Sequence, residues 1–99
     1  MLISIFISVI LTRLNDIINH TMKSVTIYST PTCHFCHAAK DFFDANNVQY
    51  HDFNVASNME KRREMMDKSG QLGVPVIVID DQVVVGFDKS RLSQLLEIK

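Results

Sequence analysis

Two cysteines three positions apart are the residues of this chain with the clearest capacity for chemistry. They are Cys33 and Cys36, within the stretch TPTCHFCH at residues 30–37. A C-x-x-C pair is typical of thiol–disulfide exchange, and C-x-x-C-H is also the string that attaches a c-type haem. The same cysteines, together with His34 and His37, would be a partial ligand set for zinc. Three kinds of chemistry therefore compete for one short segment.

The chain as a whole has the size and composition of one small globular domain. It has 99 residues, of which 46% are hydrophobic and 21% charged, and a net charge of −1. This composition argues against disorder, and the absence of a Lys or Arg run argues against nucleic-acid binding. A bridge between cysteines so close together closes too little chain to staple a fold. We therefore expect a reducing compartment, the cytoplasm. We also expect a monomer.

Residues 1–21 differ in composition from the rest and are interpreted as an N-terminal extension. Leu2–Leu11 is apolar except for two serines, and polar residues recur near helical spacing, which is typical of an amphipathic helix on the domain or on a membrane surface. The apolar run is about half the roughly 20 residues that a membrane-spanning helix needs. It also lacks the basic start and cleavage site of a signal peptide. We favour an over-extended reading frame with Met22 as the true start, which gives a domain over residues 22–99.

The segments around the cysteines predict a strand, a helix and a second strand. Ser24–Ser29 is rich in β-branched and aromatic residues and is followed by a proline turn. Apolar residues from Ala38 to Ala45 recur at a spacing of three to four, which predicts a helix that ends near Asn46. Val48–Val55 is strand-like, but its alternation slips by one residue. That slip indicates a bulge or an early end.

The next segments predict a charged helix and a β-hairpin. Ser57 and Glu60 form a capping box that opens the helix, and Gly70 ends it. The helix has little apolar surface, so most of it should face water. Val76–Ile79 and Val83–Val85 flank a polar turn, as the strands of a hairpin do.

The last helix completes the predicted fold. Asp88 can cap it, and Leu92, Leu95 and Leu96 point inward. The order β-α-β-α-β-β-α predicts an α/β fold with a four-stranded mixed sheet and helices on both faces. The wholly apolar Val76–Ile79 suits a central strand that is covered on both sides.

This order of elements places Cys33 directly after a strand and at the start of a helix. Unpaired backbone N–H groups and the helix dipole favour a thiolate there, so the pKa of Cys33 should lie below the free value of about 8.5. Cys36, one turn further on, is within reach of Cys33 and should be more buried. Cys33 would attack a substrate disulfide, and Cys36 would resolve the mixed disulfide.

The haem and zinc interpretations lack partners elsewhere in the chain. Haem attachment needs an axial partner for His37 and a large apolar pocket, for which a domain of this size has little room. Zinc needs four ligands, and beyond the motif there is His51 but no second cysteine pair. We therefore expect no haem and no zinc. His34 and His37 are expected as solvated residues of the first helical turn, with Pro31 and Thr32 shaping the loop and capping the helix.

A second signal is Gly73-Val74-Pro75, directly before the apolar strand. Proline cannot donate to a strand ladder and marks an edge or a strand start. A cis Val74–Pro75 bond would turn the backbone N–H and C=O of Val74 outward, where they could pair with an extended substrate. A trans bond would make the segment a plain loop, and both alternatives stay open.

Three ordered motifs carry a family resemblance over Lys23–Lys99. The strand–TPTCHFC–helix segment, GVP before an apolar strand and GFD after the hairpin together resemble glutaredoxins, within the thioredoxin fold. The chain is most similar to small YruB-type glutaredoxin-like proteins, and around VGFDKSRL it is similar to NrdH-type redoxins. The resemblance implies a dithiol oxidoreductase that reduces protein disulfides or glutathione mixed disulfides. Cys33 would be the nucleophile and Cys36 the resolving thiol.

The resemblance also implies a glutathione-binding site. Val74 would pair with the glutathione backbone, and Asp88, beyond its role as a helix cap, would receive the γ-glutamyl ammonium. The full set of substrate-binding residues that it implies is Thr30, Val74, Pro75, Gly86, Phe87 and Asp88.

The chain departs from the family pattern within this set and directly beside it. Thr30 stands where a lysine is common, Gly73 replaces a threonine, and Gly86 is followed by Phe87 where two glycines are typical. Glutathione as co-substrate and thioredoxin reductase as the reductant therefore both remain open. The resemblance also leaves room for an iron–sulfur carrier, in which Cys33 of two chains and two glutathiones hold the cluster.

Overall fold

The computed structural model describes residues 23–98. The extension expected over residues 1–21 and the expected start at Met22 lie outside the described residues. Within the described part, no helix is both long and apolar enough to cross a membrane. The elements, in chain order, are β1 (Val25–Ser29), α2 (His34–Ala45), β2 (His51–Asn54), α3 (Met59–Ser69), β3 (Val76–Ile79), β4 (Gln82–Val85) and α4 (Lys89–Leu96).

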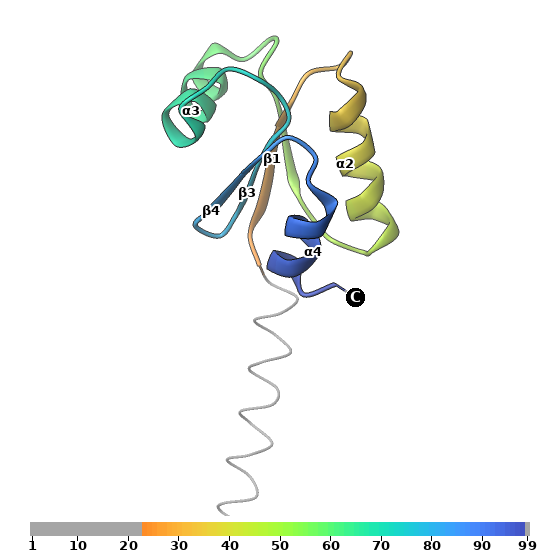
Figure 1. The fold of residues 1–99 in the computed structure, drawn as a ribbon. Helices are drawn as coiled ribbons and strands as arrows, with labels where there is room; N and C mark the ends of the chain where they lie inside the picture. The colour runs from red at the N-terminus through yellow and green to blue at the C-terminus, as the bar shows by residue number, and fades with distance from the viewer. Residues whose placement is uncertain (1–22, 99) are drawn as a thin grey trace, which may run out of the picture.

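The four strands form one mixed sheet in the order β2-β1-β3-β4 (Figure 1). β1 is parallel to β2 and antiparallel to β3, and β3 pairs with β4 as the expected hairpin. β1 and β3 are thus the central strands. All four residues of β3 are buried, because helices cover it on both faces. The predicted order of elements and the predicted fold class are both confirmed.

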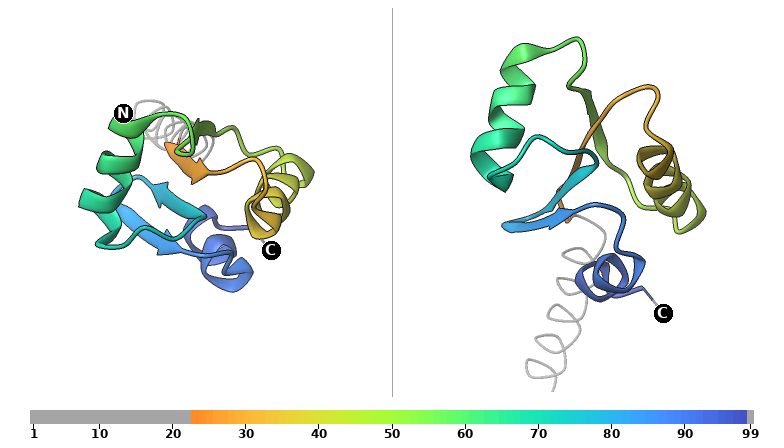
Figure 2. Two further views of the ribbon diagram at one scale, coloured as in Figure 1. Left: turned by 90° about the horizontal axis from the view of Figure 1, so that it is seen from above. Right: turned by 45° about the horizontal axis from the view of Figure 1, so that its top comes forward.

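Helices on the two faces of the sheet divide the core into two parts. α2 and α4 lie on one face and α3 on the other (Figure 2). Since side chains alternate along a strand, Val25 and Ile27 of β1 pack into the core under α2 and α4, whereas Tyr28 packs under α3. The chain therefore needs apolar residues at successive positions of its central strands, as the sequence has.

β2 is shorter than the strand predicted over Val48–Val55. The alternation of apolar residues slips because the segment contributes side chains to both cores. Val48 and Tyr50 pack into the core under α2 and α4, while Phe53 and Val55 pack under α3. The apolar residues change faces midway along the segment, and only His51–Asn54 pairs with β1.

α3 has the predicted character but a different cap. The expected capping box at Ser57 is wrong, because Asn58 is the N-cap and its Oδ1 accepts the backbone N–H of Lys61 at 3.1 Å. Asparagine is as good a cap as serine and here stands directly before the helix. Gly70 ends the helix with φ of 74°, as predicted. Met65 is the one fully buried side chain of α3, so most of the helix faces water.

Candidate functional site

The cysteine pair lies at the start of α2, directly after the loop that follows β1. Cys33 is itself the N-cap of α2, and its Sγ accepts the backbone N–H of Cys36 at 3.1 Å. The sequence interpretation gave a capping role to Thr32, and the structure corrects it by one residue. The two cysteines form a disulfide with a Cα–Cα distance of 5.2 Å. Cys36 is fully buried whereas Cys33 is partly exposed, which is the asymmetry that the sequence predicts.

The loop before the helix is held by two contacts to its backbone. The N–H of Cys33 donates to the C=O of Thr30 at 3.3 Å. His37 is exposed, as predicted. Its ring Nε2 also lies 2.8 Å from the C=O of Pro31, a contact that ties the helix to the loop before it. Phe35, between the cysteines, has 62% of its surface exposed. An exposed aromatic ring beside a reactive sulfur is a ready contact for a substrate.

The Val74–Pro75 peptide bond is cis, which decides between the two alternatives that the sequence leaves open. Gly86, with φ of 82°, donates its N–H to the C=O of Pro75 at 2.8 Å. This bond brings the start of β3 and the loop after β4 together. In residues 23–98, no hydrogen bond involves the backbone N–H or C=O of Val74, so both groups are free to pair with an extended chain.

The other implied binding residues have structural partners of their own. Asp88 caps α4, where its carboxylate accepts the backbone N–H of Arg91 at 3.1 Å. The ring of Phe87 is partly buried and meets the ring of Phe42 edge-on, at 6.0 Å between centroids. Pro75 is thus hydrogen-bonded to Gly86, and Phe87 and Asp88 are the next two residues of the chain. Within the described chain, no three His, Cys, Asp or Glu side chains are grouped to hold a metal ion.

A polar network below the site was not predicted from the sequence. Ser29, the last residue of β1, has a buried polar side chain, at 2% exposure. Its hydroxyl donates to Asp52 of β2 at 2.6 Å, and Asp52 forms an ion pair with Lys40 of α2 at 2.5 Å. The network joins both strands to the helix that carries the cysteines. Its members are far apart in sequence, and only the pairing of β1 with β2 brings them together.

Tyr28 anchors the opposite face of the same strand. Its buried hydroxyl donates to Glu64 of α3 at 2.8 Å, and Lys61 also contacts this carboxylate, at 3.2 Å. Burial, and then the hydrogen bond to Glu64, raise the pKa of Tyr28. The hydrogen bond from Tyr28 lowers the pKa of Glu64. The last two residues of β1 are therefore held on both faces of the sheet immediately before the cysteine loop.

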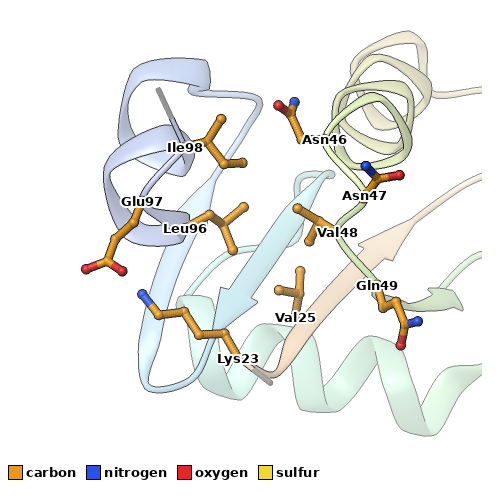
Figure 3. Close-up of a pocket in the computed structure, with 9 residues that line it drawn as sticks. All are labelled: Lys23, Val25, Asn46, Asn47, Val48, Gln49, Leu96, Glu97 and Ile98. Carbon is orange, nitrogen blue, oxygen red and sulfur yellow. The ribbon is translucent and has the colours of Figure 1, made fainter. Parts of the chain in front are cut away.

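A hollow of about 410 Å³ lies at the other end of β1. Lys23 and Val25 line it from the start of the strand, Val48 from the segment before β2, and Leu96 and Ile98 from the end of α4 (Figure 3). The cysteines follow the opposite end of β1, so this hollow is not part of the cysteine site.

Comparison with known sequences assigns the family. A sequence model of the family Glutaredoxin matches residues 25–84. The chain is a glutaredoxin family member. It is 45% identical over 73 residues to a glutaredoxin-like 8.6 kDa protein of a rubredoxin operon in Clostridium pasteurianum, covering 74% of this chain and 97% of that one. It is 39% identical over 67 residues to glutaredoxin 3 of Escherichia coli strain K12, covering 68% and 81%.

Solved structures place this glutaredoxin in the thioredoxin-like fold. A mutant form of the thioredoxin-like protein BC3987 has a TM-score of 0.74 and 36% identity, over 79% of this chain and 100% of the other. NrdH-redoxin from Escherichia coli has a TM-score of 0.65 and 26% identity, over 73% and 93%. The resemblance to glutaredoxins and to NrdH-type redoxins seen in the sequence is confirmed.

Proposed function

We propose that this glutaredoxin is a dithiol oxidoreductase that reduces protein disulfides or glutathione mixed disulfides. The observation that carries the proposal is the asymmetry of the cysteine pair. Cys33 is partly exposed and accepts a backbone N–H at the start of α2, whereas Cys36 is fully buried. A hydrogen bond to sulfur and the positive end of the helix dipole both favour a thiolate. Cys33 is therefore the nucleophile of the proposed reaction.

The reaction is two successive thiol–disulfide exchanges. The Cys33 thiolate attacks one sulfur of the substrate disulfide, which forms a mixed disulfide and releases the other half as a thiolate. Cys36, as its thiolate, then attacks the Cys33 sulfur and releases the remaining half. Two electrons pass to the substrate, and the protein is left with the Cys33–Cys36 disulfide. Two glutathione thiols or one reductase dithiol must return those electrons.

Val74 would position the substrate for the first exchange. Its backbone N–H and C=O have no partner within residues 23–98, and an extended peptide or glutathione can add to them as a short strand. Gly86 and Pro75 are already hydrogen-bonded to one another, so the site is formed before the substrate arrives. Asp88, while capping α4, would attract an ammonium group through its exposed carboxylate.

A protein reductase is a second candidate for the electron donor. None of the implied binding residues is a cation that would meet a glutathione carboxylate, since Thr30 stands at the lysine position. A solved relative, NrdH-redoxin, is a glutaredoxin-like protein described as having a thioredoxin-like activity profile. Thioredoxin reductase is therefore the alternative to glutathione.

Cysteine variants test the proposed mechanism. Cys33→Ser should abolish reduction of every disulfide, because the one remaining thiol, Cys36, is fully buried. Cys36→Ser should abolish reduction of protein disulfides but keep part of the activity on a glutathionylated peptide, which needs one thiol. Equal loss in the two variants on the glutathionylated peptide would contradict the mechanism.

A reductant exchange separates the two donors. Turnover of one disulfide substrate is measured with glutathione and glutathione reductase, and again with NADPH and thioredoxin reductase. The Cys33→Ser variant is the blank in both arms. Turnover in the first arm alone supports glutathione, and turnover in the second alone supports the protein reductase.

A further inference from the structure

The outer face of α3 carries an apolar groove with two arginines in it. The groove has a volume of about 280 Å³ and is lined by Met59, Arg62, Arg63, Met66 and Leu72. Residues 59, 62, 63 and 66 follow the spacing of one helical face, and all four are exposed. They belong to α3, the helix that lies alone on its face of the sheet (Figure 2). Nothing in the proposed redox chemistry uses these side chains.

The apolar side chains of the groove are unusually exposed for their type. Met59 is 67% exposed, Met66 43% and Leu72 51%, whereas Met65 on the inner face is fully buried. Three large apolar side chains in one concave patch are characteristic of a binding surface. Methionine side chains in particular adapt to apolar partners of different shape.

The arginines determine the charge that the groove prefers. Within residues 23–98, neither Arg62 nor Arg63 forms an ion pair, although Glu60 and Asp67 lie on the same helix. Glu64, the other acidic residue of α3, is instead engaged by Tyr28 and Lys61. Two cations without partners, between apolar side chains, complement carboxylates that are flanked by apolar residues.

We propose that this groove binds an acidic, apolar segment of the protein whose disulfide the cysteine site reduces. The second half of this statement rests on the proposed function. Leu72 is two residues before Val74, so a chain that pairs with Val74 can continue into the groove. The groove selects protein substrates, and Cys33 performs the chemistry. A membrane surface fits less well, because the apolar side chains line a concave groove of about 280 Å³, whereas a helix that lies on a lipid surface buries one continuous apolar face.

The binding test uses a peptide without cysteine, so that it is independent of the redox function. The probe is a fluorescein-labelled 15-residue peptide with two glutamates flanked by leucines, and its partner has lysines in place of the glutamates. Fluorescence anisotropy should show that the acidic peptide binds more tightly. Arg62→Glu and Arg63→Glu should each weaken its binding roughly 3- to 10-fold, the range for a charge pair at an interface rim.

Matched variants distinguish the groove from general charge effects. Lys68→Glu makes the same charge reversal on α3 outside the groove and should leave binding unchanged. Met66→Ser should weaken binding without changing charge. Equal affinity for the two peptides, or equal effects of Lys68→Glu and Arg62→Glu, would overturn the proposal.

Two further measurements test other occupants of the groove. Arginine-dependent binding to vesicles with phosphatidylserine but not to the peptide would overturn the proposal in favour of a membrane. Self-association in sedimentation that Met66→Ser abolishes, without peptide binding, would overturn it in favour of a second copy of the chain.

The activity test joins the groove to the cysteine site. The substrates are the same acidic and basic peptides, extended by four, eight or twelve residues to an intramolecular disulfide. kcat/KM should favour the acidic peptide at one spacer length or more, and Arg62→Glu should remove the preference. Bis(2-hydroxyethyl) disulfide, which is too small to reach the groove, should be reduced equally by Arg62→Glu and the unaltered protein. If the unaltered protein reduces none of these disulfides but still binds the acidic peptide, the proposed function is refuted and the groove stands as a binding site alone.

Discussion

The polar network of Ser29, Asp52 and Lys40 makes a prediction that can be worked out from its geometry. Replacing Ser29 by alanine removes a hydroxyl that donates to a carboxylate at 2.6 Å. Hydrogen bonds to charged groups contribute about 1.5–3 kcal/mol. The Asp52 side chain is 37% exposed and keeps its ion pair with Lys40, so water and Lys40 can replace the lost donor. We therefore expect Ser29→Ala to cost about 1–1.5 kcal/mol, at or just below the lower limit of that range.

Replacing Asp52 by alanine should lower the free energy of unfolding more than Ser29→Ala does, because it leaves the hydroxyl of Ser29 without an acceptor. Asp52→Ala leaves the hydroxyl of Ser29, at 2% exposure, without an acceptor, which costs about 1–3 kcal/mol. It also removes the ion pair of Lys40, whose contribution is only about 0.5–1 kcal/mol at 20% side-chain exposure. Asp52→Asn keeps an oxygen for Ser29 and loses only the ion pair. The expected order of destabilisation is Asp52→Ala, then Ser29→Ala, then Asp52→Asn.

Urea unfolding followed by circular dichroism measures these differences. For a domain of this size the slope m is about 1 kcal/mol/M, so Ser29→Ala should lower the midpoint by about 1–1.5 M with no change in slope. In the double variant with Asp52→Ala the two costs should not add, because no hydroxyl is left unpaired. A Ser29→Ala midpoint within about 0.3 M of the unaltered protein would refute the reasoning. So would equal destabilisation by Asp52→Asn and Asp52→Ala.

Three further predictions concern Tyr28, Gly70 and Asp88. Tyr28→Phe should cost about 1 kcal/mol at pH 7, discounted for the partial exposure of Glu64. Because the pKa of Glu64 is lowered in the folded state, this contribution is complete above its unfolded pKa and is lost as the pH falls through the folded pKa. The difference between the urea midpoints of Tyr28→Phe and the unaltered protein should therefore stay constant from pH 7 down to about 4.5, the unfolded pKa, and shrink at lower pH. A difference that does not shrink below that pH would contradict this. Gly70→Ala should cost about 1 kcal/mol because alanine disfavours a φ of 74°, and thermal unfolding measures it; since a Cβ at Gly70 would meet no atom within 4 Å, a larger loss would show that backbone strain is not the cause. Asp88→Ala should cost about 1 kcal/mol through the lost cap, whereas Asp88→Asn should keep stability and raise KM for glutathionylated peptide only, and an unchanged KM would remove Asp88 from the binding site.

Local signals in the sequence were sufficient for the order of the elements. The turn after Ser29, the glycine at position 70 and the aspartate at position 88 each act within a few residues of the chain, and the structure uses each of them as predicted. Errors arose where two neighbouring residues compete for the same local role. Asn58 caps α3 instead of Ser57, and Cys33 caps α2 instead of Thr32. Such a shift of one residue depends on where the preceding loop leaves the sheet, which local sequence does not determine.

Features that join distant segments were beyond the sequence. The apolar residues of Val48–Val55 change from one face of the sheet to the other, since Tyr50 and Phe53 pack into different cores. This change cannot be predicted before both cores are known. The contact between Ser29 and Asp52 depends on the register of β1 and β2. The bond from Gly86 to Pro75 likewise forms only when the hairpin closes. The sequence thus predicted the reactive pair from local spacing, but not the contacts that position it.

The same distinction bears on the electron donor, because donor choice depends on charges around the cysteine pair and not on the pair itself. Glutathione has two carboxylates, and tight binding would require cations near the cysteines. Of the lysines of the adjoining helices, Lys40 pairs with Asp52, whereas Lys89 is exposed and its ammonium lies 6.0 Å from the ring of Phe42. Glutathione would otherwise depend on the two contacts proposed for it, the backbone of Val74 and the carboxylate of Asp88. A protein donor depends less on such a pocket, because a larger contact surface, including the exposed Phe35, contributes to its binding. We therefore expect a protein reductase to reduce this chain faster than glutathione does, and the reductant exchange tests this expectation.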